Sequence, residues 1–182
     1  DLYSRTSNLL NERGLLLNGK PQRIARYPNT GFLRVGSLLK TNVVAAGSKN
    51  GTCIFKWDND RISRWETADN LWIEGYFEVE YRADTAKNCS VDAAKKQITM
   101  GESESAISYK TRWRAINLLE EIDIPGEWYV DKQSMTLYYY PPRNFDKTND
   151  ELRFTVNSNG ASIAQMIEMN GANNICFEGL EF

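Results

Sequence analysis

The sequence has 182 residues, of which 41% are hydrophobic and 25% are charged, and its net charge is −2. This composition is typical of a globular domain with a buried core; it offers no basic stripe for nucleic acid and no apolar stretch long enough for a membrane span. Histidine is absent, which excludes imidazole-based triads and histidine metal ligands, and no phosphate-binding motif points to a nucleotide. We therefore expect no cofactor, and any catalysis would depend on carboxylates, tyrosine or lysine.

The first predicted element is a β-hairpin. Residues 15–17 are three leucines, and the Asn18-Gly19 pair that follows them accepts the positive φ angles of a type I′ turn. The return strand is predicted over 23–27, where Pro28 ends it.

A short strand is predicted over 53–57, followed by a capped helical turn. The polar run at 58–60, Asp-Asn-Asp, offers N-cap side chains, and Ile62 and Trp65 would then face the core. The same run lacks the glycine and the bidentate glutamate of a calcium-binding loop, so we predict no metal site.

The clearest strand signal covers 71–82, where side chains alternate between two faces. The face predicted to be buried carries Ile73, Gly75, Phe77, Val79 and Tyr81. The face predicted to be solvated carries Trp72, Glu74, Tyr76, Glu78, Glu80 and Arg82. Such alternation is typical of an antiparallel sheet with one buried and one wet side.

The second half of the chain continues with short strands between turns. Strands are predicted at 97–100 and 151–156, a second hairpin at 128–140, and the segment 116–121 fits either helix or strand. Many short strands of this kind are typical of sandwiches and barrels. We therefore predict an all-β fold, with an antiparallel β-sandwich or barrel-like domain over 1–160.

The last residues of the sequence differ in kind from the rest. An Asn-rich turn at 170–174 and an apolar run at 175–182 are typical of one rung of a stacked parallel sheet, which cannot bury its apolar side alone. We predict that 161–182 is a short stub of parallel β-helix, its first rung or rungs, and that further rungs follow in a longer parent protein.

Five segments carry a resemblance to a known family. They are LLLNGKPQRIARYPN (15–29), DNLWIEGYF (69–77), AINLLEEIDIPGEWYVD (115–131), TLYYYPP (136–142) and NICFEGLEF (174–182). In this order they resemble the N-terminal half of right-handed parallel β-helix glycosidases, close to glycoside hydrolase family 141. In that family a β-rich domain is inserted near the start of the helix, and the catalytic carboxylates lie on later coils, which this chain does not contain.

The resemblance implies an extracellular or periplasmic enzyme that degrades plant-type polysaccharide. We interpret the chain as a non-catalytic accessory domain that shapes or flanks the substrate cleft, with carbohydrate and the rest of the parent β-helix as its partners. The fragment is not expected to be active by itself. Two alternatives remain: an autonomous carbohydrate-binding module and a purely structural bracing domain.

Most candidate substrate-binding residues lie on the solvated face of the 71–82 strand. Trp72 and Tyr76 are four residues apart, with Glu74 and Glu78 beside them. Sugars stack on aromatic rings, and carboxylates accept hydrogen bonds from hydroxyl groups. The alternative is that another element covers this face and that both rings belong to the core.

A second polar cluster precedes the turn into the second hairpin. Asn117 is a further substrate-binding candidate, because it matches the family pattern together with Glu120 and Glu121. Glu120 and Glu121 are the only catalytic candidates, but as neighbours in an extended segment they would point to opposite faces and not form an acid/base pair. The alternative is a capped turn with salt bridges to Arg112 and Arg114.

Overall fold

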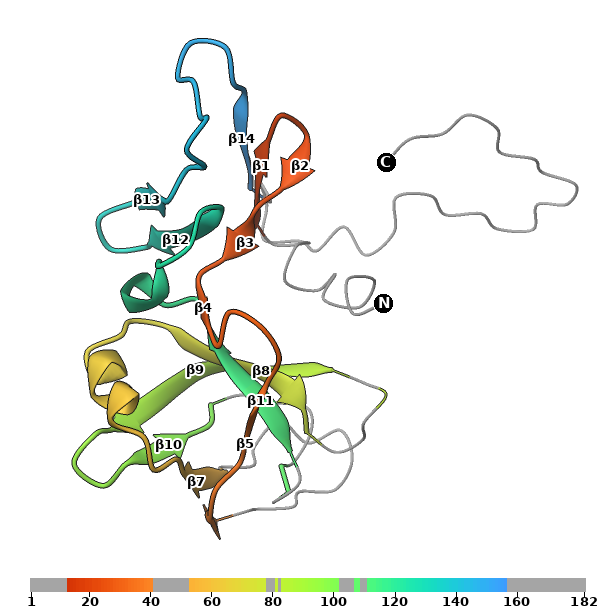
Figure 1. Cartoon of the computed structure of the whole chain (residues 1–182). Helices are drawn as coiled ribbons and strands as arrows, with labels where there is room; N and C mark the ends of the chain where they lie inside the picture. The colour runs from red at the N-terminus through yellow and green to blue at the C-terminus, as the bar shows by residue number, and fades with distance from the viewer. Residues whose placement is uncertain are drawn as a thin grey trace, which may run out of the picture.

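The computed structural model of this chain describes residues 13–40, 53–77, 81, 83–101, 107–108 and 111–156. Within these ranges the chain forms short strands and two 3-10 helices, and nearly all strand pairs are antiparallel (Figure 1). The prediction of a β-rich antiparallel domain is therefore confirmed. The rung predicted at 161–182 and the candidate Glu78 lie outside the described residues. In the described part, no helix is long and apolar enough to cross a membrane.

The largest sheet has eight strands and forms the lower body in Figure 1. Its order is β4 (Arg26–Tyr27), β11 (Arg112–Ile116), β8 (Leu71–Tyr76), β9 (Asp84–Asp92), β10 (Gln97–Thr99), β7 (Ile54–Lys56) and β6 (Leu38–Lys40), and β5 (Leu33–Arg34) also pairs with β11. The segment with β5 and β6 bridges β11 and β7, which are far apart in this order. Leu33 on β5 pairs with Trp113 on β11, and Leu38 on β6 pairs with Phe55 on β7. This connection curls the sheet into a barrel.

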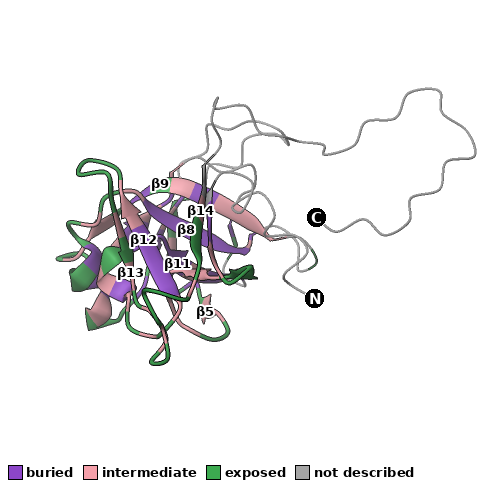
Figure 2. Ribbon diagram, turned by 90° about the horizontal axis from the view of Figure 1, so that it is seen from above, coloured by how far each residue is buried: buried purple, intermediate pink, exposed green. Residues whose placement is uncertain are grey.

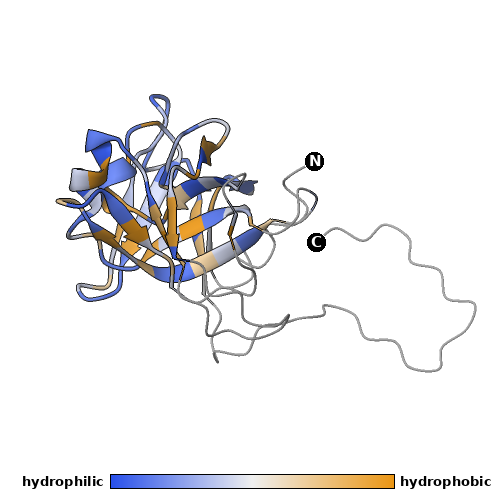
Figure 3. Ribbon diagram, turned by 90° about the horizontal axis from the view of Figure 1, so that it is seen from below, coloured by the Kyte–Doolittle hydropathy of each residue, from blue (hydrophilic) through white to orange (hydrophobic). Residues whose placement is uncertain are grey.

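Aromatic rings fill the inside of this barrel. The rings of Trp57 and Trp65 are stacked at 5.1 Å, and Trp113 meets Trp57 edge-on at 5.4 Å. Phe55 and Trp113 are both 0% exposed. Figure 2 shows the buried stretches of β8 and β11, and Figure 3 shows apolar residues gathered within the sheet. Aromatic side chains therefore make up much of the barrel core.

The short helix η2 (Asp60–Trp65) is the predicted capped turn. The side chain of Asn59 accepts a hydrogen bond from the backbone N–H of Arg61 at 2.9 Å. Ile62 and Trp65 are each 1% exposed. Both the cap and the inward direction of these two side chains are confirmed.

Two three-stranded sheets lie beside the barrel. One contains β14 (Leu152–Val156), β1 (Arg13–Leu17) and β2 (Lys20–Pro21), and the other contains β13 (Thr136–Tyr139), β12 (Glu127–Asp131) and β3 (Arg23–Ile24). The second predicted hairpin is confirmed, and so is the turn of the first, whose return strand is Lys20–Pro21. Asn18 and Gly19 have φ angles of 51° and 74°, as the turn between β1 and β2 requires.

The predicted return strand at 23–27 is wrong as a single strand. Its first part, β3, runs parallel to β12, and its second part, β4, pairs with β11. Ala25 lies between them and is 0% exposed. Its N–H donates to the carbonyl of Trp128 and its carbonyl accepts from the N–H of Asn117. Residues 23–24 and 26–27 therefore belong to two different sheets, and Ala25 connects them.

The prediction of a solvated face on β8 is wrong for two of its residues. Trp72 is 9% exposed and Glu74 is 3% exposed. The cause is that long side chains from the flanking strands lie over this face. The guanidinium of Arg114 pairs with Glu74 at 2.5 Å, and the ammonium of Lys87 lies 5.0 Å from the ring centre of Trp72.

Candidate functional site

The acidic cluster at η3 (Leu119–Glu121) is built around one buried carboxylate. Glu121 is 0% exposed. It accepts hydrogen bonds from Trp65 Nε1 at 2.7 Å and from Arg61 Nε at 3.1 Å. The hydrogen bond with Glu121 raises the pKa of the Arg61 guanidinium. A carboxylate enclosed in this way joins η3 to η2 and does not reach a substrate.

The salt bridges from this cluster to Arg112 and Arg114, given above as the alternative, do not form. Arg114 pairs with Glu74, and the Arg112 guanidinium lies 4.7 Å from the ring centre of Tyr76. The backbone carbonyl of Glu120 accepts a hydrogen bond from Arg64 instead. The cationic partners of the cluster therefore come from η2, a contact between distant segments that sequence spacing does not reveal.

The remaining candidates of the sequence are engaged with neighbouring residues. Tyr76 is half-buried, and Phe32 meets its ring edge-on at 5.4 Å. Asn117 is 7% exposed and has a φ angle of 62°. Its Nδ2 donates to the backbone carbonyl of Asn70 at 2.8 Å, which ties the end of β11 to the start of β8. For Trp72 the core alternative holds, since only 9% of its surface is exposed.

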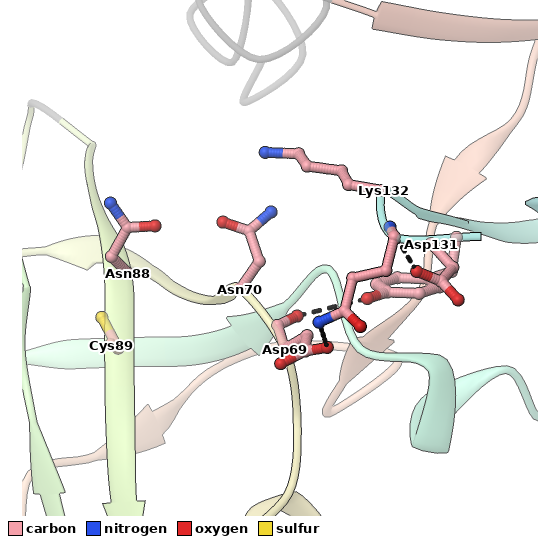
Figure 4. A pocket seen from close by; sticks show the side chains of 8 residues that line it. Asp69, Asn70, Asn88, Cys89, Asp131 and Lys132 are labelled. Atoms are coloured by element: carbon pink, nitrogen blue, oxygen red, sulfur yellow. Dashed lines mark hydrogen bonds between the residues drawn. The ribbon is translucent and has the colours of Figure 1, made fainter. Parts of the chain in front are cut away.

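A pocket of about 450 Å³ lies between the barrel and the β12–β13 hairpin, and it is open to solvent (Figure 4). The barrel contributes Asp69, Asn70, Asn88 and Cys89, and the hairpin contributes Tyr129, Asp131, Lys132 and Gln133. The pocket brings together polar and aromatic side chains from segments that are far apart in the sequence. None of these residues was a sequence-based site candidate.

Two hydrogen bonds hold the hairpin against the barrel at this pocket. Tyr129 Oη donates to the backbone carbonyl of Asp69 at 3.2 Å, and Gln133 Nε2 donates to the Asp69 carboxylate at 2.8 Å (Figure 4). Because both bonds converge on one residue, they fix the distance between the two walls. The pocket thus has a defined shape before any ligand binds.

The ionisation states of the pocket follow from its hydrogen bonds. Asp131 accepts hydrogen bonds from Ser134 Oγ at 2.6 Å and from the N–H of Gln133 at 2.8 Å, and these lower the pKa of its carboxyl group. Burial, with the nearby charges of Asp131 and Asp69, raises the pKa of Tyr129. At neutral pH the pocket therefore contains an ionised Asp131 and a protonated phenol.

Other polar groups face the open side of the pocket. Asn70 Oδ1 accepts a hydrogen bond from Trp72 Nε1 at 3.0 Å, which leaves the Asn70 amide nitrogen as a donor. In Figure 4 this nitrogen, the Asn88 amide and the Lys132 ammonium point into the same space. Within the described part of the chain, Asn88 and Lys132 make no side-chain hydrogen bond or ion pair. These groups are available to a ligand.

A β-bulge places Asn88 at the rim. The register of β9 against β8 shifts at this point, and Asn88 has a φ angle of 55°. Gly101 lies directly against the bulge. A Cβ at Gly101 would lie 1.9 Å from the carbonyl oxygen of Lys87 and 2.6 Å from that of Asn88. Only glycine permits this approach, so Gly101 helps to position Asn88.

Cys89 is the thiol that lines the pocket. Burial raises the pKa of the Cys89 thiol to about 11, which keeps it protonated at neutral pH and removes it as a nucleophile. Across the described ranges, no group of three or more aspartate, glutamate or cysteine residues is placed to hold a metal ion. The pocket therefore offers hydrogen-bond donors and acceptors in a fixed arrangement.

Comparison with solved structures finds a similar fold within a protein titled "Glycoside hydrolase". The TM-score is 0.57, the sequence identity is 16%, and the match covers 76% of this chain and 26% of the other. The chain thus corresponds to about a quarter of that protein. No protein-family profile matches the sequence, and neither does any curated protein. The similarity establishes a fold shared with a region of a glycoside hydrolase.

The pocket could have been found from the sequence only in part. The signal is a pair of asparagines, Asn70 just before β8 and Asn88 at the bulge within β9, because asparagine is enriched at positive φ and has φ angles of 65° and 55° at these two positions. The approach of the second hairpin is fixed by Tyr129 and Gln133, whose partner Asp69 is some sixty residues away in the chain. No local pattern encodes that contact.

Proposed function

We propose that this chain is a non-catalytic accessory domain of a polysaccharide-degrading glycoside hydrolase and that its pocket contacts carbohydrate beside the active-site cleft. The pocket is the observation that carries the proposal. It combines amides, an ammonium group, a carboxylate and a phenol in fixed positions. Sugar hydroxyls both donate and accept hydrogen bonds, and mixed polar groups of this kind recognise them.

The state of the acidic residues supports a non-catalytic role. Glu121 is enclosed by Arg61 and Trp65, and Glu74 is paired with Arg114. Asp131 caps the turn of the hairpin. A hydrolase of the two-carboxylate type needs an acid and a base that both reach the glycosidic bond. We place those groups in the remainder of the parent protein.

The proposal includes insertion of this domain into a parallel β-helix of the family 141 type. The pairing of β1 with β14 supports it, since Arg13 lies opposite Val156. The chain therefore enters and leaves the domain on adjacent strands, and insertion into another domain requires ends that lie close together. Such a parent would act outside the cell or in the periplasm, on plant-type polysaccharide.

Calorimetric titration of the full chain with oligosaccharides from xylan and from pectin tests the proposal. We expect saturable binding that weakens about tenfold in Asn88→Ala, which removes a free amide from the rim. Asp92→Ala is the control, because Asp92 is the last residue of the same strand, lies outside the pocket lining and pairs with Lys95. Absence of binding at about 1 mM ligand, or equal loss in both variants, would contradict the proposal.

A further inference from the structure

We infer that the pocket continues into an aromatic shelf formed by Tyr138 and Tyr140, so that the ligand is an oligosaccharide of several units and not a single sugar. This inference rests on the proposed function and names the ligand class of the same site. It follows from the register of the hairpin, the exposure of the two rings and the position of β13 at the edge of its sheet.

The register places the shelf next to the pocket. Tyr138 on β13 lies directly opposite Tyr129 on β12. Directly opposed residues of an antiparallel pair project from the same face and lie about 5 Å apart. Since Tyr129 lines the pocket, Tyr138 extends the same surface by one strand. Tyr140 is two residues further along and shares this face, about 7 Å from Tyr138.

Exposure separates these two rings from their neighbour in the same strand. Tyr138 is 39% exposed and Tyr140 is 43% exposed. Tyr139 points to the other face, where its Oη donates to Gln22 Oε1 at 2.9 Å and its ring meets Phe145 edge-on at 6.3 Å. The fold thus uses the middle tyrosine for packing and leaves the outer two open.

The position of β13 keeps the shelf accessible. In the order β13-β12-β3 it is an edge strand of its sheet. In the part of the chain that the structure describes, no strand pairs with the free side of β13. A long ligand can therefore leave the pocket and run along the strand.

The two parts of this surface suit the two kinds of sugar surface. The pocket supplies hydrogen bonds to hydroxyl groups through Asn70, Asn88 and Lys132. The shelf supplies flat rings, on which the apolar face of a sugar ring stacks while the phenol oxygen stays in water. A unit held in the pocket would place its glycosidic neighbours over Tyr138 and Tyr140.

A titration series with one polysaccharide tests this inference. The full chain is titrated with fragments of increasing length, from the monosaccharide to the hexasaccharide. We expect affinity to rise with length, and Tyr138→Ala to lower hexasaccharide affinity about fivefold while leaving the affinity for the shortest fragments unchanged. Tyr138→Phe keeps the ring and should behave as the unchanged chain.

Tyr81→Ala is the matched control, because Tyr81 is 77% exposed and lies beyond the opposite end of β8 from the pocket. Affinity that does not depend on fragment length, or a Tyr138→Ala chain that binds hexasaccharide normally, would overturn the shelf while the pocket stands. Absence of binding for every fragment would overturn the proposed function and the shelf together.

Discussion

In the barrel, Trp113 and Phe55 are 0% exposed, whereas in the hairpin beside it Tyr138 and Tyr140 are 39% and 43% exposed. The barrel rings contact one another, as in the 5.1 Å pair of Phe55 and Trp113. The hairpin rings share an open face at the edge of a sheet. Residue type alone does not distinguish these uses. Strand position does, and it separates the part that stabilises the fold from the part that meets a ligand.

The charged groups show the same division. On the barrel, Glu121 and Glu74 are buried and paired with arginines. At the pocket, Asn88 and Lys132 make no side-chain hydrogen bond or ion pair within the described residues. Satisfied polar groups stabilise a structure, while groups left open to solvent can be used for recognition. Substitutions in the barrel should therefore lower the stability of the fold, and substitutions at the pocket should lower ligand affinity with little change in stability.

Trp113→Ala is expected to have the largest effect on stability. It removes a fully buried indole from the centre of the aromatic core and should lower the free energy of unfolding by about 3–5 kcal/mol. Urea unfolding followed by tryptophan fluorescence measures the change. Tyr81→Ala, at an exposed position, serves as the reference. A loss in Trp113→Ala no larger than in that reference would refute the barrel core.

Glu121→Gln should have the second largest effect. It should lower the free energy of unfolding by about 2–3 kcal/mol, because it removes the charge that faces Arg61 at a buried site. The loss is smaller than for a fully enclosed pair, since the Arg61 side chain is 25% exposed. Glu120→Gln is the adjacent control and should leave the unfolding midpoint in urea unchanged. Equal midpoints for the two variants would show that Glu121 is not a structural clamp.

Gly101→Ala tests the link between the two regions. A methyl group 1.9 Å from the carbonyl oxygen of Lys87 forces the bulge to move, at a cost of about 1–3 kcal/mol. Ligand affinity should fall as well, because Asn88 moves with the bulge. Thermal unfolding and an oligosaccharide titration measure the two effects. If a destabilised Gly101→Ala chain keeps its full ligand affinity, Asn88 does not contribute to ligand binding.

The pH dependence of stability provides a further test. Glu127 is 0% exposed, and burial raises the pKa of its carboxyl group above the ordinary value. The folded state therefore holds this proton more tightly than the unfolded state, so stability is greatest below the unfolded pKa of about 4.3 and is lost as the pH rises through the folded value. Glu127→Gln lacks this titration.

Urea unfolding between about pH 4 and about pH 7 compares the two chains. The chain with Glu127 should lose stability relative to Glu127→Gln as the pH rises. Stability curves that stay parallel across this range would mean that the pKa of Glu127 is the same in the folded and unfolded states.

Tyr138→Ala should have the smallest effect on stability, less than about 0.5 kcal/mol, because its ring is exposed and on an edge strand. Thermal unfolding measures this change. A loss comparable to that of Trp113→Ala would show that the hairpin face is a packing surface, and the contrast between the two regions would disappear.

Turn chemistry explains why the hairpins were predictable. Asn18-Gly19 has the positive φ angles that only a few residue types accept.

The strand β9 was not predicted, although it is the longest of the described strands. Its sequence, Asp-Thr-Ala-Lys-Asn-Cys-Ser-Val-Asp, has small inward residues such as Ala86 and Cys89 and gives no apolar alternation.

The site was less predictable than the fold. Alternation along β8 correctly marked a strand, but the pattern does not show which neighbours lie over each face. Glu74 is buried because Arg114 reaches it from the adjacent strand. The pocket depends on the approach of Tyr129 to Asp69, a tertiary contact. Local periodicity predicts whether a residue lies in a strand. It does not predict how two sheets pack against each other, and the pocket forms where they do.

Backbone amide NMR of the full chain during titration with a hexasaccharide can locate the carbohydrate site residue by residue. We expect chemical-shift changes confined to the pocket and the shelf, at Asp69, Asn70, Asn88, the 129–133 segment, Tyr138 and Tyr140. Amides around the barrel core at Trp57 and Trp113 should stay unchanged. Changes at the far side of the barrel with none at the hairpin would contradict the assignment of the carbohydrate site.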